Sequence, residues 1–122
     1  MDAEITYIEL KNIALQEFPD IVVSVNILRG PLHVVKSLRI FLIDNSFLEI
    51  WISGQKYSYH WQRTDGKIYR HDNAPHKKHR HIKTFPKHFH DASEENVKES
   101  QLDNNPNNAL IGILRFIRRE IK

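Results

Sequence analysis

Residues 33–71 read HVVKSLRIFLIDNSFLEIWISGQKYSYHWQRTDGKIYRH, and this stretch decides the fold. Apolar and polar side chains alternate along its segments, which is typical of half-buried β-strands. Short turn sequences separate the segments: Asp44-Asn45, Gly54-Gln55 and Asp65-Gly66. Turns of this length join antiparallel neighbours. The pattern predicts strands over 33–43, 47–53, 56–63 and 67–71, and the alternating segment 21–29 adds one before them.

Helical patterns flank these strands on both sides. Residues 4–18 place apolar side chains at helical spacing and stop before Pro19, and residues 106–121 begin with Pro106 and repeat the spacing. Residues 72–105 show no sustained period, although 95–100 is compatible with a short edge strand. We therefore expect a single α+β domain over residues 1–122. It has an antiparallel β-meander of about five strands, an N-terminal and a C-terminal helix on one face, and a long His-rich loop.

Alternation along 56–63 divides its side chains between two faces of the sheet. The side chains expected on the buried face are Tyr57, Tyr59 and Trp61. The opposite face then holds Ser58, His60 and Gln62. We also expect Trp51 in the core.

The composition is that of an ordinary folded protein without disulfides. The chain has 122 residues, 40% of them apolar and 27% charged, which is enough to bury a core. It has no cysteine, which excludes thiolate metal sites and fits the cytosol. No apolar run approaches the ~20 residues of a membrane span, and the first residues lack a secretory pattern. We expect a cytoplasmic protein that does not enter a membrane.

Six of the eight histidines lie within twenty residues: His71, His76, His79, His81, His88 and His90. Imidazole titrates near neutral pH, so it can transfer protons or bind a metal. The same stretch has five basic and no acidic residues between 76 and 90, namely Lys77, Lys78, Arg80, Lys83 and Lys87. Such a segment suits an anionic partner.

Three motifs in order, YSYHWQ (57–62), DNAPH (72–76) and FPKHFHD (85–91), resemble the TumE-like family of prokaryotic proteins. The resemblance covers most of residues 38–121. It implies a cytosolic toxin that is encoded beside an antitoxin. The chain departs from the family pattern at His71, where that pattern has a tryptophan, and so lacks a large flat ring at this position.

The first functional hypothesis is metal-independent cleavage of RNA by an endoribonuclease. This reaction needs a base for the 2′-hydroxyl, an acid for the leaving oxygen and a cation for the phosphate. Arg70 and Lys87 are suited to phosphate, and Asp72 to fixing a histidine tautomer. The candidate catalytic residues are His60, Arg70, Asp72, His76, His88 and His90. The candidate RNA-binding residues are Lys77, Lys78, Arg80, Lys83 and Lys87.

Two other functions stay open. The pairs His79-x-His81 and His88-x-His90 could bind zinc or another transition metal in a metal-binding protein or hydrolase. The basic neighbours disfavour a dication, so we expect no cofactor. Alternatively, the segment binds RNA or an acidic antitoxin through charge alone, without catalysis. The expected partners are RNA and a cognate antitoxin, and the sequence allows a homodimer.

Overall fold

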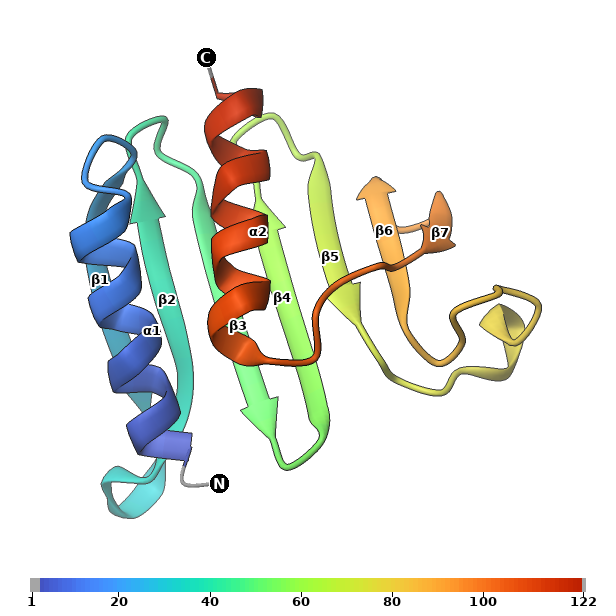
Figure 1. The fold of residues 1–122 in the computed structure, drawn as a ribbon, viewed down its shortest axis with the longest axis horizontal. Coiled ribbons are helices and arrows are strands. Elements are labelled where there is room, and N and C mark those ends of the chain that lie inside the picture. The colour runs from blue at the N-terminus through green and yellow to red at the C-terminus, as the bar shows by residue number, and fades with distance from the viewer. Residues whose placement is uncertain (1–2, 122) are drawn as a thin grey trace.

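The computed structural model describes residues 3–121, and its strands form one antiparallel sheet in sequence order (Figure 1). The strands are β1 (Val22–Arg29), β2 (Val35–Leu42), β3 (Phe47–Ser53), β4 (Lys56–Gln62), β5 (Ile68–Asp72), β6 (His88–Ala92) and β7 (Val97–Glu99). The helices are α1 (Ala3–Glu17) and α2 (Pro106–Glu120). The α+β class, the meander and the two flanking helices are therefore confirmed. No helix among residues 3–121 is long and apolar enough to cross a membrane.

The expected count of five strands and the single His-rich loop are wrong. β6 lies within the segment expected to be a loop, and β7 falls inside the predicted edge segment 95–100. β6 escaped prediction because it is short and its buried face carries histidines instead of apolar side chains. The remaining irregular segment, 73–87, contains one turn of 3-10 helix, Lys77–His79.

Both helices cover the same face of the sheet (Figure 1). The predicted stripe of α2 forms part of the core, because Leu110, Ile113, Leu114 and Ile117 are buried. Asn105 caps the helix: its side chain accepts a hydrogen bond from the backbone N–H of Asn108 at 3.2 Å. The opposite face of β3 to β5 has no α-helix over it, so polar side chains there can meet a ligand (Figure 1). On this face, the 3-10 turn Lys77–His79 covers part of β6.

The two faces of β4 are as expected. Tyr59 and Trp61 are buried under α2, where the Trp61 ring meets Phe116 edge-on at 6.0 Å, and His60 faces the other way. The expectation that Trp51 lies in the core is wrong, because 40% of this residue is exposed. Trp51 pairs with Ser58 across β3 and β4, and this register places it on the uncovered face.

Candidate functional site

The register of the sheet brings distant polar residues into two adjacent rows on the uncovered face. In one row, His60 of β4 lies opposite Arg70 of β5, and Arg70 lies opposite His90 of β6. In the next row, Asp72 of β5 lies opposite His88 of β6. Opposed residues in an antiparallel sheet have Cβ atoms about 5 Å apart on the same side. The rows therefore form one contiguous polar site.

Arg70 is held by carboxylates on two sides. Its Nε donates to Asp72 Oδ2 at 3.0 Å, and its two terminal nitrogens donate to the carboxylate oxygens of Glu94 at 2.6 and 2.7 Å. Arg70 Nη1 also lies 3.4 Å from His60 Nδ1. The hydrogen bonds from Arg70 lower the pKa of Glu94. The two terminal nitrogens of Arg70 can thus donate together to the two oxygens of an anion, and here they donate to the Glu94 carboxylate.

Asp72 connects Arg70 to the histidines. Its carboxylate is largely buried and accepts a hydrogen bond from the backbone N–H of Ala74 at 3.0 Å. Asp72 Oδ1 lies 3.0 Å from His88 Nε2, and Oδ2 lies 3.7 Å from His90 Nε2. One carboxylate therefore faces two imidazoles.

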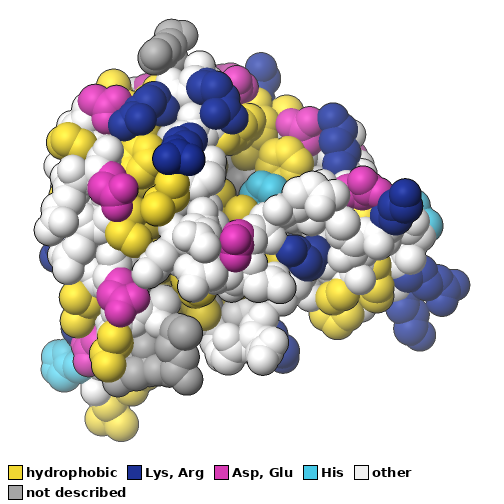
Figure 2. Space-filling view, viewed as in Figure 1, with side chains coloured by type: hydrophobic (Ala, Val, Ile, Leu, Met, Phe, Trp, Pro, Cys, Tyr) yellow, Lys and Arg dark blue, Asp and Glu magenta, His cyan; other side chains and the backbone are white. Residues whose placement is uncertain are grey.

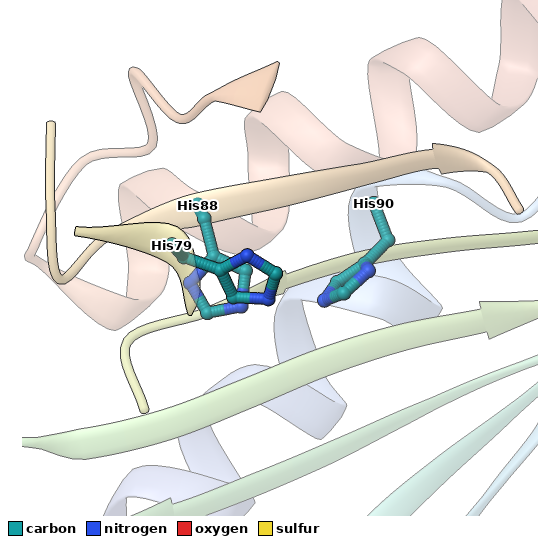
Figure 3. A group of neighbouring side chains, drawn as sticks. All are labelled: His79, His88 and His90. Carbon is teal, nitrogen blue, oxygen red and sulfur yellow. The ribbon is translucent and has the colours of Figure 1, made fainter. Parts of the chain in front are cut away.

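Three imidazoles face one another beside this carboxylate (Figure 3). His88 and His90 come from β6, and His79 comes from the 3-10 turn that folds back over it. One ring nitrogen of each lies within 4.8 Å of the other two. The exposed fractions of His79, His88 and His90 are only 7%, 1% and 4%. We call these three residues the histidine cluster.

Backbone carbonyls fix the tautomers of two members of the histidine cluster. His88 Nδ1 lies 2.9 Å from the Pro86 carbonyl oxygen, and His90 Nδ1 lies 2.9 Å from that of Glu94. A carbonyl only accepts, so each Nδ1 carries the proton and each neutral ring presents an Nε2 lone pair. Burial is the main cause that lowers the pKa of His79 and His90, so both are neutral at pH 7.

A polar cleft of about 430 Å³ opens over the site. Its lining consists of Arg70, Asp72, His76, Lys78, His79, His90, Glu94, Glu95 and Val97. A second depression of about 260 Å³, next to it on the uncovered face, is lined by Arg39, Phe47, Glu49, Trp51, Ser58 and His60. Basic side chains gather at the edge of the molecule where residues 77–87 lie (Figure 2). The surface around the site therefore combines charge with exposed aromatic rings.

The structure brings together most of the candidate catalytic residues. Arg70, Asp72, His76 and His90 line one cleft, His88 lies directly behind Asp72, and His60 contacts Arg70. His81 and Lys83 are exposed and line a different depression. The two histidines of the expected metal-binding pair His79-x-His81 therefore do not point into the same site. Lys87 lies away from the cleft, where its ammonium group donates to the Leu102 carbonyl.

Sequence reasoning missed two residues of this surface. Glu94 lies in the acidic stretch 91–103, and only the turn between β6 and β7 brings it to Arg70. Trp51 follows Glu49 by two positions, and this parity with a charged residue could have placed it on the polar face.

His71 faces the helices instead of the site. Its ring stacks on Phe89 with 4.3 Å between centroids, and its Nδ1 lies 2.8 Å from Ser100 Oγ. It lines an apolar pocket of about 270 Å³ beside α2, on the side shown in Figure 2. Burial, followed by the positive charge of Lys87, lowers the pKa of His71 to about 4. A flat ring at this position therefore packs the sheet against α2.

Comparison with known proteins identifies a family. A family described as toxin TumE matches residues 11–121 of the chain. No curated protein and no solved structure matches it.

Proposed function

Because the chain belongs to the TumE family, whose members are toxins of toxin–antitoxin systems, we propose that it acts by cleaving RNA in the cleft over β5 and β6. A cognate antitoxin is the partner that this family implies. The observation that carries the proposal is the position of Arg70, a phosphate-binding cation that contacts His60 on one side and lines the cleft together with His76.

Arg70 is the phosphate-binding residue of this proposal. A phosphate presents two oxygens to a guanidinium in the same forked geometry as a carboxylate. Glu94 now makes that forked contact, and it lies in an exposed turn. An RNA phosphate takes the place of the Glu94 side chain, while Asp72 continues to hold Arg70 from behind.

The imidazoles that RNA can reach are His60 and His76. His60 lies beside Arg70, with its Nε2 3.1 Å from Gln62 Oε1, and His76 is exposed at the rim of the cleft. We assign the base and the acid to these two residues. His88 is too deeply buried to touch a substrate, so its role is to act on Asp72. Of the histidines expected from the sequence to be catalytic, this assignment keeps His60 and His76 as proton-transfer groups.

The uncovered face also offers contacts to bases and to further phosphates. The exposed ring of Trp51 lines the same depression as His60. In this depression the Arg39 guanidinium lies 4.3 Å from the centre of the Phe47 ring. Bases of single-stranded RNA stack on such rings regardless of sequence. Lys77, Lys78 and Arg80 are exposed near the cleft and can contact the backbone. The substrate that fits is single-stranded RNA laid across β3 to β6.

The test is cleavage of RNA by the purified protein, together with mapping of 5′ ends in cells that express it. Arg70→Gln and His76→Gln should abolish new 5′ ends and growth arrest. His81→Gln is the matched control, because His81 lies in the same segment but outside the cleft. Thermal unfolding of each variant shows whether a loss of activity is a loss of folding.

Growth arrest without new 5′ ends would reject the ribonuclease. The non-catalytic alternative then makes a different prediction. Arrest should survive His76→Gln but disappear when Lys77, Lys78 and Arg80 are all replaced by glutamate.

A further inference from the structure

We propose that His79, His88 and His90, together with the carboxylate of Asp72, form a binding site for a transition-metal ion such as Zn²⁺. This inference concerns binding and does not depend on the reaction that the protein catalyses. It rests on four features of the described residues.

The first feature is the convergence of three buried imidazoles. Ring nitrogens of the histidine cluster lie within 4.8 Å of one another, and the three residues are almost fully buried. Asp72 adds an oxygen 3.0 Å from His88 Nε2 and 3.7 Å from His90 Nε2. Three nitrogens and one carboxylate oxygen are a ligand set that Zn²⁺ accepts in a tetrahedral site.

The second feature is the backbone support of the rings. The carbonyls of Pro86 and Glu94 accept the Nδ1 protons of His88 and His90. Metal-bound histidines usually donate their other N–H in this way, which fixes the tautomer and aims the free nitrogen. Both free Nε2 atoms face Asp72 and the same small volume.

The third feature is a buried nitrogen without a partner. His88 Nε2 makes no hydrogen bond, although Asp72 Oδ1 is 3.0 Å away. A positive group between this nitrogen and the carboxylate oxygen stabilises both atoms, and a bound metal ion can supply it. Burying a polar atom without a partner destabilises the fold, and a metal bond to Nε2 would supply the missing partner.

The fourth feature is the charge around the cluster. From the sequence alone, the basic segment is expected to disfavour a dication. In the structure, however, Lys77, Lys78 and Arg80 are exposed, so solvent screens their charges. Arg70 is neutralised by its contacts with Glu94 and Asp72. Beside the cluster, the carboxylates of Asp72 and Glu94 balance the cations Arg70 and Lys78, so no net positive charge opposes a metal ion.

Imidazole ligands select the metal class. They favour Zn²⁺, Co²⁺, Ni²⁺ or Cu²⁺ over Mg²⁺ and Ca²⁺, which prefer oxygen. His79, His90 and Asp72 also line the cleft, so an ion bound by them faces the surface assigned to RNA. If bound, such an ion would add Lewis-acid chemistry to this surface, but the inference concerns binding alone.

The experiment measures metal binding without RNA. Chelator-treated protein is titrated with Zn²⁺ against a chromophoric competitor and with Co²⁺ by visible absorption. We expect one equivalent per chain and a Co²⁺ spectrum of tetrahedral coordination by three nitrogens and one oxygen. His79→Gln and His90→Gln should each weaken Zn²⁺ binding at least about tenfold, by loss of a direct ligand. His81→Gln should bind like the parent chain.

Two results overturn the proposal: no stoichiometric Zn²⁺ binding by the parent chain, or equal affinities in the His79, His90 and His81 variants. If His88→Gln fails to fold, the other two variants and the Co²⁺ spectrum still decide. Zn²⁺ binding without RNA cleavage rejects the ribonuclease alone. RNA cleavage by a chain that binds no Zn²⁺ rejects the metal site alone.

Discussion

Lowering the pH from 7 to 4 is expected to destabilise the fold through His71. Burial, with a contribution from Lys87, lowers the pKa of His71 from 6.5 to about 4. The unfolded chain therefore binds a proton near pH 6.5 that the folded chain does not bind until about pH 4. Because the unfolded state holds more protons in this window, stability falls as the pH falls. The contribution is fully present above pH 6.5 and is lost progressively down to pH 4.

The magnitude follows from the size of the shift. A change of one pKa unit corresponds to about 1.4 kcal/mol, so the shift at His71 amounts to about 3 kcal/mol. Phenylalanine keeps the stacking on Phe89 and the apolar contacts of the pocket but cannot take up a proton. The variant His71→Phe should therefore lose about 3 kcal/mol less than the parent chain between pH 7 and pH 4.

Urea unfolding at pH 7, 5.5 and 4 measures the difference, with fluorescence of the buried Trp61 as the signal. His81→Phe controls for replacing an exposed histidine of the same protein. Other titrating groups are common to all three chains and cancel in the comparison. If the parent chain and His71→Phe lose stability in parallel, burial of a neutral His71 does not limit stability in acid.

Three further substitutions test the surface and the fold. Glu94→Gln should strengthen binding of single-stranded RNA about threefold, because it removes a half-exposed competitor for Arg70; fluorescence anisotropy measures it, and unchanged affinity would contradict the role given to Glu94. Trp51→Ala should weaken the same binding about tenfold while the melting temperature stays the same, and a loss of folding instead would mean that this ring supports the core. Asn105→Ala should lower the free energy of unfolding by about 1 kcal/mol in urea, through loss of the cap on α2; an unchanged midpoint would show that the cap contributes nothing.

The meander could be predicted because local signals agree along it. Turn sequences at Asp44-Asn45, Gly54-Gln55 and Asp65-Gly66 delimit alternating segments, and the observed strands follow them closely. The same alternation placed His60 opposite to Trp61, which the structure confirms.

β6 could not be predicted because its buried face is polar. His88 and His90 are buried by one another, by His79 and by Asp72, so the strand lacks the apolar period on which prediction depends. The prediction that Trp51 lies in the core is wrong for the opposite reason, because this apolar side chain lies on the uncovered face.

The site depends on this unpredicted strand. Asp72 meets His88, and Arg70 meets His90, only through the pairing of β5 with β6. The sequence identifies the residue types and groups them within twenty positions, but it does not give the register that aligns them. The exclusion of His81 from the histidine cluster likewise depends on the turn at Lys77–His79.

The order of strands has a consequence for synthesis of the chain. Every strand pairs with its sequence neighbour, so the sheet can assemble progressively while translation continues. α2 follows all seven strands and contributes Leu110, Leu114 and Ile117 to the core. A nascent chain that has not yet released α2 from the ribosome has an open hydrophobic layer and no stable platform for its site. The folded domain is therefore complete only after α2 has emerged.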